Sequence, residues 1–295
     1  MRIKKIQSNK LSLANSGALE LFFFGVGSAF TKRQSQTNLL IIKGKDHLLV
    51  DCGTRLPPLI TQLGLKVTDI RNILITHSHA DHIGGLEEIA LTGKYAARKK
   101  PVMIINSTYQ RILWDMSLRG GCGYNEWDMS LRGGTDYNEN ETLAKLSFKD
   151  FFDVLRPRLL PGFPRETFEA RVGRIKIKLM RTKHIPDSSP DWKSSFWSCG
   201  IIINDRVMFT SDTRYDPDLI DFYEKKFRLE ALFHDCQFTT GGIHAGIEEL
   251  NQLPKSIKKK MFLTHYGDDW EDFLEKVSSY GFAGLAKQQV RYIFD

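Results

Sequence analysis

Three histidines and one aspartate stand close together in residues 77–82, which read HSHADH. They follow a short apolar run and precede two glycines and the apolar spacing of a helix. We therefore expect a buried strand that delivers these side chains at its C-terminal end, with a helix after it. His77 and His79 are two residues apart, so on an extended backbone they point the same way, whereas Asp81 and His82 lie past the bend and can face a second position. Two adjoining groups of ligands are what a two-metal hydrolytic site requires.

Three more residues with ligand side chains stand where expected strands end. They are His184, His265 and Asp212. Strand ends converge on one edge of a sheet, so we expect these side chains to gather near residues 77–82.

The run HSHADH resembles the HxHxDH signature of the metallo-β-lactamase superfamily. The resemblance implies an α/β fold, an αββα sandwich with its metal site at the edge where the two sheets meet. It also implies roles for individual residues: His77, His79 and His184 as ligands of one metal, Asp81, His82 and His265 as ligands of the other, and Asp212 as the bridging carboxylate. It makes Asp51 the residue that orients the histidine loop, although Asp51-Cys52-Gly53 also fits an ordinary turn.

These ligand types suit two divalent metal ions. Imidazole and carboxylate fit zinc, our first choice, and also manganese or iron. Such a pair would hold a bridging hydroxide at neutral pH and stabilise charge on the oxygen of the attacked group. We expect Asp81 to ligate and orient that nucleophile.

Cleavage of a phosphodiester expels an alkoxide, and a proton donor near the leaving oxygen typically helps by about 10²–10⁴-fold. His244 stands 21 residues before His265. In the tRNase Z and phosphodiesterase branch of the superfamily, which this chain resembles, a histidine at a comparable distance acts as general acid and an upstream acidic residue holds it. Asp235 is the nearest equivalent, at a shorter spacing, and His244 could instead be a structural loop histidine. We expect His47 and His234 to be structural.

The tRNase Z enzymes carry a long arm between the third histidine motif and the bridging aspartate. Here His184 and Asp212 are only 28 residues apart, which leaves no room for the arm. We therefore expect a dinuclear phosphodiesterase for a small substrate such as a cyclic nucleotide. The alternatives are a tRNase Z-like ribonuclease, a metallo-hydrolase of esters, lactones or amides, and a non-catalytic or redox protein with two irons.

Composition limits the setting in which this chemistry occurs. The 295 residues include no apolar run of membrane length, and the four cysteines are scattered without a C-x-x-C pair, so we expect an intracellular, cytoplasmic protein. The net charge of +7 is concentrated at 94–100 and 255–260, which favours an anionic phosphodiester or nucleotide, although a solvated surface explains each patch equally well. By analogy with the same branch, a homodimer is possible.

Strand and helix patterns appear twice along the chain, which fits two αβ halves packed sheet to sheet. We expect strands at 19–25, 37–42, 46–50, 101–105, 171–180, 229–233 and 260–264, a hairpin over 196–210, and helices at 55–64, 83–92, 145–155 and 269–280. No linker marks a boundary, so we predict a single domain over residues 1–295 with an insertion at about 108–168.

The predicted insertion contains a tandem duplication. Residues 114–126 are repeated as 127–139 with 11 of 13 positions identical. Each copy carries Gly-Gly, which would break a helix, and two units are too few for a solenoid. We interpret the duplication as a recent event in an exposed loop that either covers a site or is simply tolerated.

Overall fold

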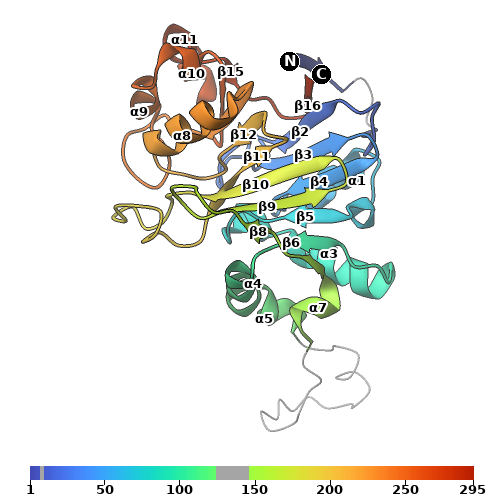
Figure 1. The fold of residues 1–295 in the computed structure, drawn as a ribbon. Coiled ribbons are helices and arrows are strands. Elements are labelled where there is room, and N and C mark those ends of the chain that lie inside the picture. The colour runs from blue at the N-terminus through green and yellow to red at the C-terminus, as the bar shows by residue number, and fades with distance from the viewer. Residues whose placement is uncertain (7–9, 124–145) are drawn as a thin grey trace.

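The computed structural model describes residues 1–6, 10–123 and 146–295. These residues form two eight-stranded sheets with helices outside them (Figure 1). The predicted αββα sandwich is therefore confirmed. None of the helices within these ranges combines the length and the apolar character that crossing a bilayer requires.

The first sheet comes from the N-terminal half of the chain and includes the C-terminal strand. Its order is β1-β16-β2-β3-β4-β5-β6-β7. The bounds are β1 (Arg2–Lys5), β2 (Leu19–Gly25), β3 (Asn38–Lys43), β4 (Asp46–Val50), β5 (Asn72–Leu74), β6 (Val102–Ile104), β7 (Asp153–Leu155) and β16 (Val290–Phe294). Strands β4 to β7 are parallel, so their C-terminal ends lie at the same edge of the sheet.

The second sheet has the order β15-β14-β13-β12-β11-β10-β9-β8. The bounds are β8 (Arg158–Leu159), β9 (Thr167–Val172), β10 (Ile175–Arg181), β11 (Cys199–Ile203), β12 (Val207–Phe209), β13 (Ala231–Asp235), β14 (Met261–Thr264) and β15 (Gly284–Leu285). Strands β12 to β15 are parallel, and β10 runs in their direction because both β10 and β12 are antiparallel to β11. The ends of β10, β12, β13 and β14 therefore share one edge.

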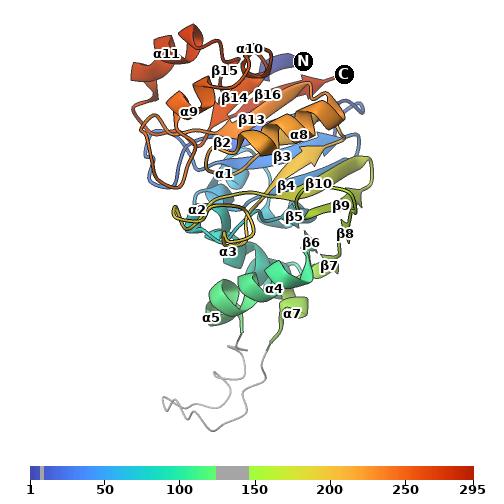
Figure 2. The same ribbon diagram turned by 60° about the vertical axis from the view of Figure 1, so that its left-hand side comes forward.

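Helices cover each sheet on its outer side (Figure 2). The helices next to the first sheet are α1 (Leu56–Gln62), α2 (Ala80–Ile83), α3 (Leu86–Leu91), α4 (Ser107–Leu113), α5 (Arg119–Cys122) and α7 (Phe148–Phe151). Those next to the second sheet are α8 (Pro217–Phe227), α9 (Ile247–Asn251), α10 (Lys255–Lys258) and α11 (Leu274–Ser279). Short 3₁₀ turns occur at Val67–Asp69 and Trp270–Phe273, and π-helical turns at Thr92–Ala96 and Trp114–Leu118.

Strand β2 shows how the layers are held together. All seven of its residues are buried. Leu21 and Phe23 pack into the cluster between the sheets, whereas Phe22 and Phe24 pack beneath the helices of the first sheet. The ring of Phe23 lies 5.9 Å from that of Phe209 on β12 of the opposing sheet. The continuous apolar run LELFFF is thus explained by a strand that is covered on both faces.

Three sequence-based expectations about elements were wrong. The segment 171–180 is a hairpin of β9 and β10, because Gly173 turns the chain at φ +51°. The expected helix over 145–155 is reduced to α7, and the chain then extends as β7 and pairs with β6. The Gly-Gly of the first repeat copy does not break the helix but lies within α5.

The predicted domain and insertion boundaries remain a prediction. Within the predicted insertion, β7 and β8 are strands of the two sheets. The first repeat copy is described as far as residue 123, where Leu118 and Cys122 are buried. The second copy, 127–139, lies outside the described residues.

Candidate metal centre

The predicted ligands come together at the edge of the sandwich where α2 lies (Figure 2). His77 and His79 lie in the loop after β5, Asp81 and His82 lie in α2, His184 follows β10, Asp212 follows β12, and His265 follows β14. Because these strand ends share one edge of the sandwich, they bring the seven predicted ligands to one place.

The first group of donor atoms comprises His77, His79, His184 and Asp212. Nδ1 of His79 lies 3.1 Å from Nε2 of His77 and 3.3 Å from Nε2 of His184. One carboxylate oxygen of Asp212 lies 3.7 Å and 3.9 Å from the same two Nε2 atoms. Three imidazole nitrogens and one oxygen thus face a common point.

The second group comprises Asp81, His82, His265 and again Asp212. Oδ2 of Asp81 lies 3.1 Å from Nε2 of His82 and 3.2 Å from Nε2 of His265. Asp212 approaches these nitrogens with both oxygens, at 3.4 Å from His82 and 3.3 Å from His265. Its carboxylate is therefore shared between the groups, as a bridging ligand would be.

Buried polar atoms without hydrogen-bond partners accord with a divalent cation bound in this cluster. Among the described residues, Nε2 of His82 and both carboxylate oxygens of Asp212 are buried without a hydrogen-bond partner. Leaving a buried polar atom unpaired is costly, and buried charges are usually paired or bound to metals. The donor set of imidazole and carboxylate suits zinc and its neighbours in the first transition row.

Protonation of the first group also favours metal binding. Burial lowers the pKa of His184 to about 4 and holds the pKa of His77 well below its ordinary value. Both imidazoles are thus neutral near pH 7 and offer a free nitrogen lone pair.

Charges within the second group are coupled. Burial alone would lower the pKa of His82, but the carboxylates of Asp212, Asp51 and Asp81 raise it well above its ordinary value. Burial alone would raise the pKa of Asp212, but the imidazoles of His265 and His82 hold it well below its ordinary value. A cation bound here would displace the proton of His82.

Asp51 lies directly behind the histidines. Its Oδ2 accepts a hydrogen bond from Nδ1 of His82 at 2.8 Å, and its Oδ1 accepts one from the backbone N–H of Thr76 at 2.8 Å. This is the geometry of a carboxylate that orients a ligating imidazole. Whether it acts on a bound metal in this way remains a prediction.

Sequence reasoning missed two hydroxyls in this network. The Oγ1 of Thr76 contacts Asp51, lies 2.9 Å from Oγ of Ser211 and lies 3.2 Å from Nδ1 of His77. Thr76 thereby links the loops that follow β4, β5 and β12. The only hint in the sequence was that each of these hydroxyl residues directly precedes a predicted ligand: Thr76 precedes His77, and Ser211 precedes Asp212.

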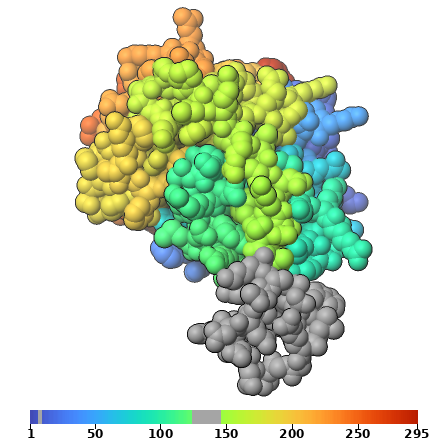
Figure 3. All heavy atoms as spheres, turned by 60° about the horizontal axis from the view of Figure 1, so that its bottom comes forward, coloured from blue at the N-terminus to red at the C-terminus, as the bar shows by residue number. Residues whose placement is uncertain are grey.

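A tyrosine was missed as well. The hydroxyl of Tyr109 on α4 lies 3.0 Å from Oγ of Ser78, and its ring stacks on Trp197 at 5.7 Å. In the space-filling view the green surface around α4 adjoins the yellow surface of the loop that contains Trp197 (Figure 3). Helix α4 therefore supports the histidine loop from the side.

His244 and Asp235 stand beside the second group. Nδ1 of His244 lies 2.7 Å from Oδ2 of Asp235, so the short spacing between them in sequence does not prevent the pairing. Burial would lower the pKa of His244, but the carboxylates of Asp235 and Asp212 raise it to about 9. A bound cation would oppose this shift. The side chain is 19% exposed, so the ring can reach solvent or a ligand.

Three residues of the site have left-handed backbone conformations that are unusual outside glycine. They are Asp51 at φ +66°, Ser211 at φ +50° and His265 at φ +63°. Such conformations cost about 1–3 kcal/mol each and cluster at functional sites. Hydrogen bonds hold two of them, from Asp51 N–H to the Leu74 carbonyl at 2.9 Å and from His265 N–H to the Val26 carbonyl at 2.7 Å.

The other two histidines have structural surroundings. Nε2 of His47 accepts the backbone N–H of Arg71 at 3.1 Å. His234 is fully buried in β13, and its Nδ1 contacts the backbone oxygen of Asp235 at 2.7 Å.

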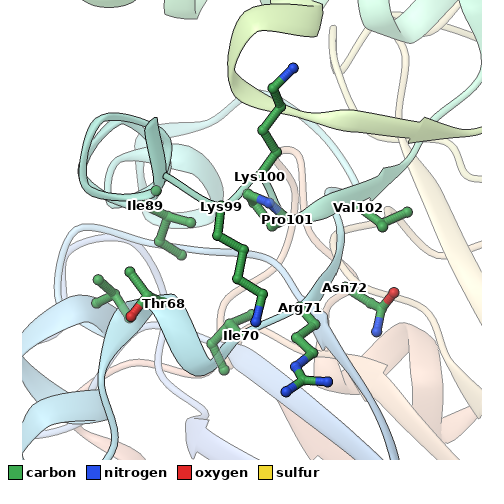
Figure 4. A pocket seen from close by; sticks show the side chains of 11 residues that line it. Thr68, Ile70, Arg71, Asn72, Ile89, Lys99, Lys100, Pro101 and Val102 are labelled. Atoms are coloured by element: carbon green, nitrogen blue, oxygen red, sulfur yellow. The ribbon is translucent and has the colours of Figure 1, made fainter. Parts of the chain in front are cut away.

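The two basic patches differ. In 255–260, Lys258 bonds to Asn251, and Lys260 pairs with Glu224, so their ammonium groups stabilise the fold. In 94–100, Lys99 points along a hollow of about 260 Å³ toward Arg71 (Figure 4). That hollow lies at the N-terminal ends of β5 and β6, and is therefore at the opposite edge from the metal centre.

Comparison with known proteins identifies the family. A family model described as "Anti-Pycsar protein Apyc1" matches residues 19–292. An anti-Pycsar protein Apyc1 from Paenibacillus harenae is 35% identical over 269 residues, which cover 91% of this chain and 97% of the relative. One from Bacillus phage BSP38 is 35% identical over 267 residues, covering 88% and 93%.

Solved structures agree on the fold. The metallo-β-lactamase fold protein YhfI from Bacillus subtilis superimposes with a TM-score of 0.63 at 16% identity, covering 94% of this chain and 99% of YhfI. A diphosphatase of the PhnP family gives 0.61 at 14% identity, covering 94% and 98%, and human short-form tRNase Z gives 0.56 at 16%, covering 92% and 98%. The resemblance to the metallo-β-lactamase superfamily is confirmed, and the chain belongs to the anti-Pycsar Apyc1 family within it.

Proposed function

We propose that this metal-dependent hydrolase is a dinuclear phosphodiesterase that cleaves a small phosphodiester such as a cyclic nucleotide. The observation that carries the proposal is the arrangement around Asp212. Two donor groups share this carboxylate, and His244, paired with Asp235, lies next to it. The description of the family as anti-Pycsar proteins accords with this substrate class.

We assign the metals by the two groups of donors. His77, His79 and His184 would hold one divalent ion, and Asp81, His82 and His265 the other, with Asp212 shared. We propose zinc, with manganese or iron as alternatives that the same ligands accept. When bound, such a pair supplies Lewis acidity, which lowers the pKa of a water and withdraws charge from a phosphoryl oxygen.

The remaining chemistry belongs to the side chains. Asp81 offers a carboxylate oxygen that can orient the attacking water while it ligates. His244 is held through Nδ1 by Asp235 at 2.7 Å, so its Nε2 is available to donate a proton to the leaving oxygen. An alkoxide is strongly basic and needs this proton in order to leave, whereas a weakly basic leaving group such as p-nitrophenolate does not.

The segment between His184 and Asp212 favours a small substrate over pre-tRNA. All of its residues lie in the described part of the chain, and they form one loop, 185–198, followed by the β11–β12 hairpin. No long arm therefore extends from this position. A tRNase Z-like ribonuclease remains the second candidate, because human short-form tRNase Z shares the fold.

The test is an assay of the purified protein with cyclic mononucleotides and with pre-tRNA, together with metal analysis. We expect turnover of a cyclic mononucleotide and two divalent ions per chain. Turnover of pre-tRNA alone would refute the ranking of substrates. Hydrolysis of esters or lactones without phosphodiesters would favour the wider class of metallo-hydrolases, and iron with oxygen chemistry would favour a redox protein.

A further inference from the structure

Two phenylalanine rings are exposed on loops that adjoin the metal centre. Phe30 is 87% exposed and Phe196 is 69% exposed, whereas Phe22, Phe23 and Phe24 of β2 are fully buried. An exposed aromatic ring offers a face on which a nucleobase can stack.

The Phe30 loop is joined to the second donor group. The carbonyl of Val26 accepts the N–H of His265 at 2.7 Å, and the N–H of Ser28 bonds to the carbonyl of Tyr266 at 3.1 Å. The carboxylate of Asp268 accepts the N–H groups of Lys32 and Arg33 at 2.6 and 3.0 Å. Phe30 therefore lies between two anchored ends of a short loop.

The Phe196 loop is joined to the first donor group. It begins next to His184, and the N–H of Phe196 bonds to the carbonyl of Ile185 at 2.7 Å. The guanidinium of Arg181 donates to the carbonyls of Ser195 and Phe196 at 3.1 and 3.2 Å. The backbone is thus fixed close to His184 while the ring of Phe196 is left in solvent.

Arg214 holds the other part of the same loop. Its Nε donates to the carbonyl of His184 at 3.1 Å, and its terminal nitrogens donate to the carbonyls of Asp187 and Ser189. Two arginines therefore use their donors on the backbone of 185–198. A loop that is constrained in this way positions its exposed ring reproducibly, as substrate binding requires.

We propose that Phe30 and Phe196 bind the base of the nucleotide substrate by stacking, one from each side of the metal centre. Aromatic side chains stack on every base, because each base has a π-face. The inference rests on the proposed phosphodiesterase function and deepens it. It predicts an enzyme that tolerates different bases but discriminates against substrates without one.

The experiment compares two substrates that share the scissile group. One is a nucleoside 3′,5′-cyclic phosphate, and the other is the cyclic phosphate of 1-O-methylribose, which lacks the base. We expect Phe30→Ala and Phe196→Ala each to lower kcat/KM for the nucleotide about tenfold, mainly through KM. Neither should change kcat/KM for the abasic compound, and Phe→Trp at either position should restore the nucleotide activity.

Ile3→Ala is the matched control, since Ile3 is also exposed, at 51%, but lies on β1, the edge strand of the first sheet that is five strands away from β5 and its histidine loop. Equal losses on both substrates, or no loss on either, would overturn the stacking role. A wild-type protein that hydrolyses neither compound would instead refute the proposed function, and the stacking role with it. If the wild-type protein hydrolyses both compounds and each Phe→Ala variant affects them equally, the stacking role is refuted but the proposed function is not.

Discussion

Replacement of His244 by alanine provides the sharpest test of the proposed chemistry. Nδ1 of His244 is held by Asp235 at 2.7 Å, which leaves Nε2 as its only free nitrogen. If that nitrogen protonates the leaving oxygen, His244→Ala removes the donor. The damage should then depend on how much the leaving group needs a proton.

The expected magnitude follows from general acid catalysis. With a cyclic nucleotide, which expels an alkoxide, kcat should fall by about 10²–10⁴-fold. This corresponds to about 2.7–5.4 kcal/mol of transition-state stabilisation. With a p-nitrophenyl ester of a nucleotide, the leaving phenolate is weakly basic, and the fall should stay within about tenfold. Asp235→Asn should show the same dependence on the leaving group with smaller losses, because the ring is retained but less firmly oriented.

Metal content must be measured on the same preparations, because His244 lies in a cluster with Asp212 and His265. Equal losses on both substrates would refute the role of His244 as general acid. Loss of bound metal together with both activities would show that His244 is a ligand. Full activity on the cyclic nucleotide would show that His244 is structural. A protein that hydrolyses an ester, lactone or amide instead, with full activity in the His244→Ala variant, would belong to that wider class.

Three further predictions concern other parts of the chain. His77→Ala or Asp81→Ala should abolish turnover and lower the metal content while the circular dichroism stays close to wild type; unchanged turnover in either variant would defeat the metal assignment. Deletion of 127–139 should leave the free energy of unfolding nearly unchanged, and a loss of several kcal/mol would show that the second copy packs into the core. Deletion of 114–126 gives a chain that differs from the first deletion only in carrying Thr135-Asp136 in place of Cys122-Gly123. This second variant should be less stable, because Cys122 is buried. Burial and Arg71 lower the pKa of His47, so the unfolded chain binds the proton more readily and stability is lost as pH falls below about 6.5. His47→Gln keeps an acceptor for the Arg71 N–H, and in denaturant titrations at several pH values it should reduce this loss of stability. Stability curves that run parallel for the two proteins would contradict the lowered pKa of His47.

Much of the site could be predicted because its residues have distinctive types at strand ends. HSHADH concentrates four donors, and His184, Asp212 and His265 each follow a strand whose apolar run is easy to recognise. Parallel pairing within each sheet then brings these ends to one edge. The convergence of these strand ends could therefore be predicted without knowing how the helices pack.

Errors arose where a turn or a helix was not recognised in the local sequence. The alternation of 171–180 continues through Gly173, so a hairpin looked like one strand. The helix α8 was not anticipated, although Asp216 caps it by accepting the N–H of Leu219 and Pro217 occupies its first turn. That signal was present in the sequence, since an aspartate followed by proline is a typical helix start.

Tertiary packing overrode local propensity at the first repeat copy. Gly120 and Gly121 favour a helix end, yet α5 continues through them. Leu118 and Cys122 are buried on either side of the pair, in the same cluster as Phe151. Burial of these side chains offsets the unfavourable glycines, and only the assembled core reveals it.

The backbone of the site was the least predictable part, and a physical conflict explains why. At a sharp turn after a strand, glycine adopts positive φ without strain, but it has no side chain with which to form a hydrogen bond or bind a metal. Asp51, Ser211 and His265 occupy such turns and retain their side chains, at a cost of about 1–3 kcal/mol each. The buried layer around Phe23 must supply the stability that offsets this cost. Residue type alone does not indicate such positions, since even aspartate and histidine, which are enriched at positive φ, adopt it in only a small fraction of cases, and serine is not enriched. A metal centre of this design therefore depends on two fully packed sheets, and weakening their core should loosen the site before the fold is lost.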